Sequence, residues 1–361
     1  MPFNEPWWWP TGVTDAEKPR KESPIVAHLQ RVFQTLALHR RLVLSLLIVA
    51  GLVLTPAAGT IAQDEDRPTV TIGSKDFTEQ FIVSEMIAVL LEDAGYDVER
   101  ALNLGGSAIA HTALVEGEID IYVEYTGTGL LAILGMDLPA EGADASPAAG
   151  ASPAAGGSPA AGGGLAQDVY DIVSAEYQDQ FGLTWLEPWG FNNTYTLALR
   201  AADVEELGLE TISDLEGVSG DLTFGATQEF VVRPDGLPGL TVAYGIEFGD
   251  AVGMDPGLVY SALDSGDVDI ISAFATDGRI PALNLVLLED DLGFFPPYFA
   301  APVVRQELLE ASPEIADILN QLAGVIDNQT MADLNFRVDE GGEEPIDVAT
   351  SFLQEQGLIE G

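Results

Sequence analysis

Aromatic side chains stand next to glycine, proline or asparagine at several places where strands are expected to end. The clusters that combine these features are Tyr122–Gly129, Phe191–Tyr195, Phe274–Arg279 and Phe295–Tyr298. A single aromatic residue in such a place is more often part of a core than of a binding site. Repeated at four turns, the rings indicate a cleft whose walls present π faces, which attract diffuse positive charge.

Basic side chains are rare in most of the chain, so each one is informative. Residues 68–361 contain seven Lys and Arg, and the only lysine among them is Lys75. Lys75 lies between an expected strand and the N-terminus of an expected helix, where an ammonium group suits an anionic group on a ligand. The alternative is a surface lysine that pairs with Asp76 or Glu79. Arg233, in the turn 233–236, is a second candidate cation.

The elements that must position these residues alternate between short β-rich runs and helical patterns. Apolar patterning and glycine stops predict strands at 70–72, 98–104 and 119–122, and helices at 79–94 and 109–116. A β-α-β-α-β series is typical of a mostly parallel sheet with helices on both faces. The predicted fold class is therefore α/β.

The same series occurs twice in the chain. Two pairs of segments match, 113–121 with 262–270 (Ala-Leu-x-x-Gly-x-x-Asp-Ile in both) and 71–73 with 223–225. In the first register Tyr125 corresponds to Phe274. We interpret the match as two α/β lobes of related design, with a ligand cleft at the carboxyl ends of the strands. The alternative is a coincidence between common helix-Gly-strand turns.

The charge of the chain excludes some classes of partner. The formal net charge is −44, and residues 68–361 hold 51 Asp and Glu. Such a surface repels nucleic acids and anionic lipids, so neither is an expected partner. It is typical of solubility in a salty or hot habitat, and it also favours cationic ligands, although salt screens the attraction beyond about 10 Å. Because cysteine is absent, disulfides, thiolate nucleophiles and a cysteine-linked lipid anchor are excluded.

Two segments have the composition of export and linker sequences. Arg40 and Arg41 precede an apolar run at 42–54, which has the length of a signal-peptide core and is short for a membrane span. We predict an N-terminal extension at 1–41 and a signal core with its cleavage zone at 42–62. Two alternatives for this N-terminal segment remain: a start codon assigned too far upstream, or an uncleaved membrane anchor. Residues 139–164 contain Ser-Pro-Ala-Ala-Gly three times and are expected to form a low-complexity loop.

The residue pattern gives little support to enzyme chemistry. The Gly-x-Ser-x-Gly elbow, the phosphate-binding P-loop and the His-Glu-x-x-His metal motif are all missing from the sequence. His111 is expected on a helix face, and Asp120 and Glu124 are expected to cap turns and not to share a proton. We predict that the protein is not an enzyme and that it uses no cofactor and no metal.

Residues 69–359 resemble the substrate-binding proteins of ABC importers for glycine betaine, choline, carnitine and related osmoprotectants. The resemblance rests on the motifs GSKDFTEQ (73–80), GEIDIYVEYTGTG (117–129), NNTYTLALR (192–200) and ATDGRI (275–280). It implies a type II periplasmic-binding-protein fold with two lobes and two crossovers between them. Lobe 1 would comprise 69–192 and 297–361, including the loop at 139–164, and lobe 2 would comprise 193–296.

The resemblance also implies a ligand-binding site. It assigns an aromatic cage for a quaternary ammonium group to Tyr125, Tyr195, Phe274 and Tyr298, with Phe274 at a position where relatives often have tyrosine. The positions that hold a ligand carboxylate are matched by Lys75, Thr128 and Arg233. Asn193 matches an Asx position at the crossover. A cage for the cation and basic donors for the carboxylate together form a site for a zwitterion.

The implied function is that of an exported, monomeric protein that captures glycine betaine and delivers it to the permease of an ABC importer. Choline or carnitine in the same role is one alternative. A membrane-tethered sensor module with the same fold is another. The expected location is the periplasm or the extracellular face of the cytoplasmic membrane, with membrane contact only through an uncleaved N-terminal segment.

Overall fold

The computed structural model describes residues 67–139 and 164–361. The expected extension at 1–41, the expected signal region at 42–62 and nearly all of the expected loop at 139–164 lie outside the described residues. None of the helices in the two described ranges is both long enough and apolar enough to cross a membrane. Within those ranges, no group of three or more His, Asp or Glu is arranged to hold a metal ion.

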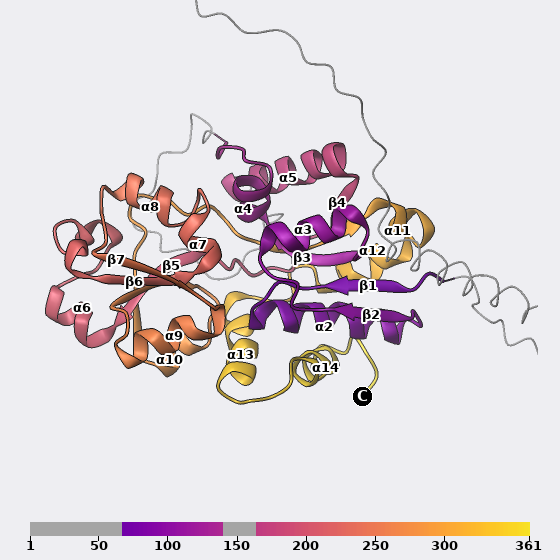
Figure 1. The fold of residues 1–361 in the computed structure, drawn as a ribbon. Coiled ribbons are helices and arrows are strands. Elements are labelled where there is room, and N and C mark those ends of the chain that lie inside the picture. The colour runs from indigo at the N-terminus through magenta and orange to yellow at the C-terminus, as the bar shows by residue number, and fades with distance from the viewer. Residues whose placement is uncertain (1–66, 140–163) are drawn as a thin grey trace, which may run out of the picture. The chain divides into compact units, whose positions relative to one another are not determined.

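The first sheet has the strand order β2-β1-β3-β10-β4, and Figure 1 labels all of these strands except β10. Its strands are β1 (Val70–Gly73), β2 (Val98–Ala101), β3 (Ile121–Tyr125), β4 (Leu183–Trp185) and β10 (Ala300–Arg305). Strand β1 pairs in parallel with β2 and β3, whereas β10 pairs antiparallel with β3 and β4. The strands at the start of the chain therefore follow the predicted β-α-β-α-β series.

The second sheet repeats this design with the order β7-β6-β8-β5-β9. Its strands are β5 (Tyr195–Arg200), β6 (Thr223–Thr227), β7 (Asp250–Met254), β8 (Ile270–Phe274) and β9 (Leu285–Leu288). Strand β6 pairs in parallel with β7 and β8, and β5 pairs antiparallel with β8 and β9. The prediction of two α/β lobes of related design is confirmed.

One hydrogen bond occurs at the same place in both sheets. The Asp120 carboxylate accepts from the backbone N–H of Thr71 at 2.9 Å, and the Asp269 carboxylate accepts from that of Thr223 at 2.8 Å. These are the residues that the repeated sequence pattern aligns. Asp120 thus links β1 to the start of β3. This link explains why an Asp stands at the same position in both copies of the repeated pattern.

Both sheets are mostly parallel, as predicted, and in the described residues the one antiparallel strand of each is the strand that enters from the other sheet. The first residue of β10, Ala300, pairs with the last residue of β3, Tyr125, and the first residue of β5, Tyr195, pairs with the last residue of β8, Phe274. The chain thus enters each sheet at the edge where the parallel strands end. The entering strand must run against them, which makes both sheets mixed.

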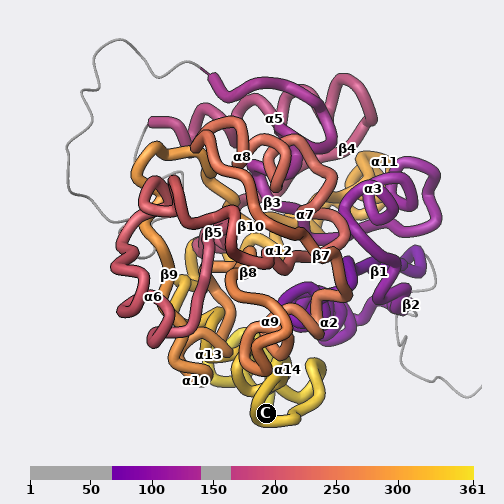
Figure 2. The backbone as a smooth tube through the Cα atoms, turned by 60° about the vertical axis from the view of Figure 1, so that its left-hand side comes forward, coloured from indigo at the N-terminus to yellow at the C-terminus, as the bar shows by residue number. Residues whose placement is uncertain are grey.

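Helices cover both faces of each sheet. Around the first sheet lie α2 (Thr78–Asp93), α3 (Ser107–Glu116), α4 (Thr126–Thr128), α5 (Leu165–Phe181), α11 (Gln306–Ala311), α12 (Glu314–Leu319), α13 (Asn328–Asp339) and α14 (Pro345–Glu355). Around the second lie α6 (Ala201–Leu207), α7 (Gln228–Val232), α8 (Leu237–Tyr244), α9 (Pro256–Ser265) and α10 (Arg279–Ala282). Figure 2 shows the C-terminal α14 beside α2, which is far from it in sequence.

Successive side chains of the central strands point to opposite faces of the sheet, which explains why both faces are covered by helices. In β3, Ile121 and Val123 pack in the core cluster that contains α2, whereas Tyr122 packs in the cluster that contains α3 and α5. All five residues of β3 are buried, as expected of a strand with helices on both sides. In β8, Ile270 and Ile271 divide between two clusters in the same way.

The two segments that cross between the sheets lie side by side. Asn192 precedes β5 and forms an isolated bridge with Phe299, which precedes β10. The Asn192 side chain accepts from the backbone N–H of Tyr298 at 2.7 Å, and the backbone N–H of Asn193 donates to the carbonyl of Tyr298 at 3.1 Å. Both crossings are therefore held together at one place, next to the ends of the central strands.

Candidate functional site

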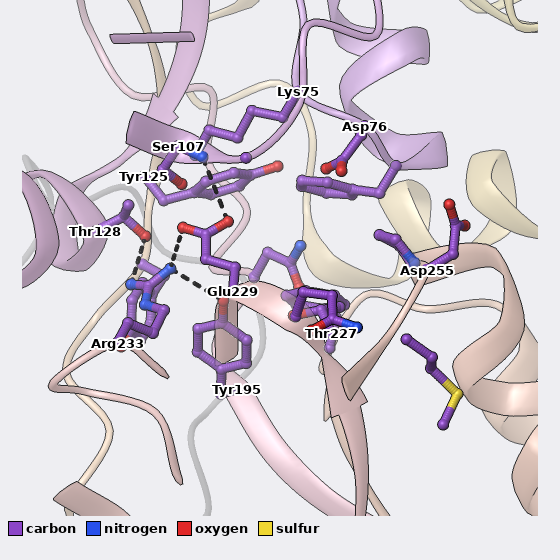
Figure 3. Close-up of a pocket in the computed structure, with 18 residues that line it drawn as sticks. Lys75, Asp76, Ser107, Tyr125, Thr128, Tyr195, Thr227, Glu229, Arg233 and Asp255 are labelled. Atoms are coloured by element: carbon purple, nitrogen blue, oxygen red, sulfur yellow. Dashed lines mark hydrogen bonds and ion pairs between the residues drawn. The ribbon is translucent and has the colours of Figure 1, made fainter. Parts of the chain in front are cut away.

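A cavity of about 350 Å³ lies where the carboxyl ends of the parallel strands of both sheets meet (Figure 3). All eight residues that the sequence analysis proposed line this cavity: Lys75, Tyr125, Thr128, Asn193, Tyr195, Arg233, Phe274 and Tyr298. They come from the ends of β1, β3 and β8, from α4, from the residues after α7, and from the start of β5 and β10. Ligand sites of open α/β sheets occupy this position.

Gly127 allows one of the rings to reach the cavity wall. A Cβ atom at Gly127 would lie 2.7 Å from the ring of Tyr298 and 2.9 Å from the carbonyl oxygen of Pro297. Any larger residue would therefore push Tyr298 away from the strand end. The glycine in the run 125–129 thus has a packing role in the site.

Three of the four proposed cage rings contact one another, and Phe77 connects the fourth, Tyr125, to them. The ring centroid of Tyr195 lies 5.0 Å from that of Phe274 and 5.4 Å from that of Tyr298, which it meets edge to face. Phe77 extends the group, since it stacks on Phe274 at 5.4 Å and faces Tyr125 at 6.2 Å. Sequence reasoning missed Phe77, although it stands in the motif 73–80, two residues after Lys75.

Lys75 is paired, but with neither of the partners that the sequence suggested. Its ammonium group forms a salt bridge with Glu124, and both side chains are buried. The Glu124 carboxylate also accepts from the Tyr122 hydroxyl at 3.0 Å and from the backbone N–H of Tyr125 at 2.7 Å. The expectation that Glu124 caps a turn is therefore wrong, because it neutralises a buried lysine. The ammonium lies 4.9 Å from the ring centroid of Tyr125.

Arg233 is the second cation of the cavity, and it is also buried. Its guanidinium donates to both carboxylate oxygens of Asp235, to the hydroxyl of Tyr195 at 3.1 Å and to that of Thr128 at 3.2 Å. A further N–H donates to the carboxylate of Glu229 at 3.2 Å. Because Thr128 belongs to the first sheet's side and Arg233 to the second, this guanidinium joins the two walls.

Three acidic side chains line the same cavity, and none of them was proposed from the sequence: Asp76, Glu229 and Asp255. Burial raises the pKa of Asp76, and the nearby carboxylates of Glu229 and Asp255 raise it further. The spacing of Glu229 and Arg233, four residues apart, is a signal of contact on a helix that sequence reasoning did not use.

Asn193 belongs to a buried polar group at the crossing. Its amide donates at 2.8 Å to the fully buried carboxylate of Glu79. The same carboxylate accepts from the Tyr125 hydroxyl at 2.7 Å, the Asn335 amide at 3.0 Å and the Thr276 hydroxyl. Burial raises the pKa of Glu79, while these four hydrogen bonds oppose the rise. Glu79 therefore ties together residues from both sheets and from α13.

His111 does not line the cavity. It lies in α3, where its ring meets those of Tyr177 and Phe181 edge to face at 5.3 and 4.7 Å. Burial lowers its pKa to about 4, helped by the charge of Lys75. His111 is thus a packing residue on a helix face, as predicted.

Comparison with known proteins agrees with this architecture. Residues 68–355 match the family described as the substrate binding domain of ABC-type glycine betaine transport systems. The chain is 37% identical to the glycine-betaine-binding protein of Pseudomonas aeruginosa, over 89% of this chain and 96% of that one. It is 34% identical to the ergothioneine transport permease/ergothioneine binding protein EgtU of Helicobacter pylori, over 91% of this chain but only 56% of that relative's length.

A solved structure supports the same relationship. The crystal structure of a glycine betaine/carnitine/choline ABC transporter protein superposes with a TM-score of 0.60 at 33% identity, over 80% of this chain and 99% of that chain. The fold of the described residues is therefore shared with a protein of known structure.

Proposed function

The chain belongs to the family of substrate-binding domains of ABC-type glycine betaine transport systems, and on that premise we propose that it captures a small quaternary ammonium osmolyte, with glycine betaine as the leading candidate. The group of rings that lines one cavity from both sheets carries the proposal. A quaternary ammonium group has no N–H to donate, so a site recognises its diffuse charge and methyl bulk. Aromatic faces match both, at about 0.5–2 kcal/mol per contact.

The residues have distinct roles in this proposal. Tyr125, Tyr195, Phe274 and Tyr298 surround the trimethylammonium group, and Phe77 backs two of these rings. The Arg233 guanidinium donates to the Thr128 hydroxyl at 3.2 Å, and these two side chains form the end that receives a ligand carboxylate. We assign Lys75 mainly to holding the ring of Tyr125, because Glu124 already neutralises its charge. Asn193 and its partner Glu79 form the hinge.

We propose that lobe 1 comprises 69–192 with 297–361 and that lobe 2 comprises 193–296. The strands of each sheet fall within these ranges, which supports this division. Ligand contacts from both lobes couple binding to closure. A monomer outside the cytoplasmic membrane would then deliver the ligand to the permease of an ABC importer. Choline and carnitine share the trimethylammonium group and are the alternatives within this role.

A ligand screen tests the proposal. Thermal unfolding of the purified protein is followed with glycine betaine, choline, carnitine and common amino acids. A ligand at 100 times its dissociation constant should stabilise the protein by about 2.7 kcal/mol. The matched control is 3,3-dimethylbutan-1-ol, the uncharged carbon analogue of choline, which should leave the midpoint unchanged. The proposal fails if none of the three trimethylammonium compounds raises the midpoint, and the cage assignment fails if the neutral analogue matches choline.

A further inference from the structure

The carboxylate of Glu229 stands between the two walls of the cavity, beside Arg233. One oxygen accepts from the Arg233 guanidinium at 3.2 Å, and the other accepts from the backbone N–H of Ser107 at 3.3 Å. Ser107 is the first residue of α3, on the first sheet's side, whereas Glu229 and Arg233 come from the second. In Figure 3 the carboxylate points between Tyr125 and Arg233, with Tyr195 on its other side.

The backbone is shaped to receive this carboxylate. Gly106 precedes Ser107, and a Cβ atom at Gly106 would lie 2.8 Å from the nearer oxygen of Glu229. The φ angle of Gly106 is −71°, so its conformation does not require glycine. The missing side chain instead makes room for the carboxylate at the N-terminus of α3, where backbone N–H groups favour a negative charge.

The charges of the cavity wall determine how the Glu229 carboxylate affects a ligand. Of the two basic side chains that line the cavity, Lys75 is paired with Glu124, and Arg233 with Asp235 and Glu229. A ligand carboxylate that approaches Arg233 therefore meets a carboxylate already bound to it. A cationic ligand meets the opposite situation, because the same negative charge attracts it.

We propose that Glu229 is a specificity-determining residue: it occupies the position of a ligand carboxylate, so it disfavours zwitterionic betaines relative to cationic ligands such as choline. This inference rests on the function proposed above, and it deepens it by naming the residue that sets the balance between the two ligand classes. A betaine binds its carboxylate to Arg233 only after the Glu229 side chain has moved from Ser107 and Arg233. Choline, which has a hydroxyl in place of the carboxylate, binds without that exchange.

The test compares Glu229→Gln with the wild-type protein. Glutamine keeps the size of the side chain and removes its charge, so the variant should bind glycine betaine more tightly and choline more weakly. The ratio of the betaine to the choline dissociation constant, measured by calorimetry at low salt, should fall by about tenfold or more, since two like charges at close range repel. The control is Glu205→Gln on α6, an exposed carboxylate outside the cavity, which should change neither constant.

Each outcome has a distinct meaning. If the wild-type protein binds neither compound, the proposed function fails and this inference falls with it. If the wild-type protein binds them and Glu229→Gln keeps the wild-type ratio, the function stands and the role of Glu229 is refuted. If Glu229→Gln does not fold, Gly106→Ala replaces it, because the added methyl must push the carboxylate from α3. That variant should lower the ratio by about threefold, and an unchanged ratio would overturn the inference.

Discussion

Removal of one member of the buried pair of Lys75 and Glu124 should cost far more stability than removal of one member of an exposed pair. Their side chains are 3% and 0% exposed, and removal of one member of a buried pair costs about 3–5 kcal/mol. Glu124 keeps the donors Tyr122 and Tyr125 when Lys75 is lost, which offsets part of the cost. We therefore expect the lower figure, about 3 kcal/mol, for Lys75→Met and a similar loss for Glu124→Gln.

The double variant carries the sharper expectation. With both charges removed, Lys75→Met/Glu124→Gln should lose no more than either single variant, so the coupling energy should be about 3 kcal/mol. Equilibrium urea unfolding measures it through the fluorescence of Trp185 and Trp189, which are buried beside the same sheet.

A more exposed pair, between Arg337 on α13 and Glu343 after the end of that helix, provides the matched control for this cycle. Arg337 and Glu343 are 31% and 42% exposed, and a cycle of Arg337→Met and Glu343→Gln should give a coupling far smaller than that of the buried pair. A Lys75–Glu124 coupling as small as that of the control would refute the reasoning, and Lys75 would again be available as a donor for a ligand carboxylate.

Three further outcomes are expected. Burial raises the pKa of Glu79 above 4.5, so between pH 4.5 and that raised pKa the folded state binds more protons than the unfolded one, and stability falls as pH rises. Urea unfolding of wild type and Glu79→Gln across this range should show that stability falls more steeply with pH in wild type than in the variant, and parallel curves would contradict it. Tyr195→Ala should weaken every trimethylammonium ligand about tenfold, whereas Tyr195→Phe, which loses only the hydroxyl that accepts from Arg233, should stay within about threefold; calorimetry that gives equal losses would remove the ring from the cage. Gly266→Ala should cost about 1 kcal/mol because its φ is +82°, and Gly117→Ala should cost more because its Cβ would also lie 2.6 Å from the Arg305 guanidinium. The thermal unfolding midpoint should be highest for wild type, lower for Gly266→Ala and lowest for Gly117→Ala. Equal midpoints for the two variants would contradict this expectation.

The repeated architecture could be predicted because local signals encode it. Gly117 and Gly266 both end a helix in the left-handed conformation, and an Asp three residues later caps the neighbouring strand in each sheet. The antiparallel strands β5 and β10 could not be predicted in the same way. Their direction depends on the edge at which the chain enters a sheet, and no local window of sequence contains that information.

The residues of the site could also be predicted only in part. Residues at strand ends, such as Tyr125 and Phe274, could be predicted to meet because parallel strands share one edge. The partners of the charged residues could not, because they depend on which side chains face one another after folding. Lys75 lies 49 positions from Glu124, whereas of the two closer acids Glu79 accepts from the Tyr125 hydroxyl and Asp76 lines the cavity. Glu229 could not be predicted because its role depends on its contact with Ser107, which belongs to the opposite wall of the cavity.

The place of β10 in the first sheet constrains the order in which the chain can acquire its structure during synthesis. Strand β10 lies between β3 and β4, yet residues 300–305 are made long after both of them. The second sheet, by contrast, is complete once Leu288 has been made. A growing chain that stops before residue 300 therefore holds one sheet whose five strands are all present and another that lacks the strand between β3 and β4. Until that strand arrives, β3 and β4 each have an edge without a partner, which is the kind of surface that chaperones protect from aggregation.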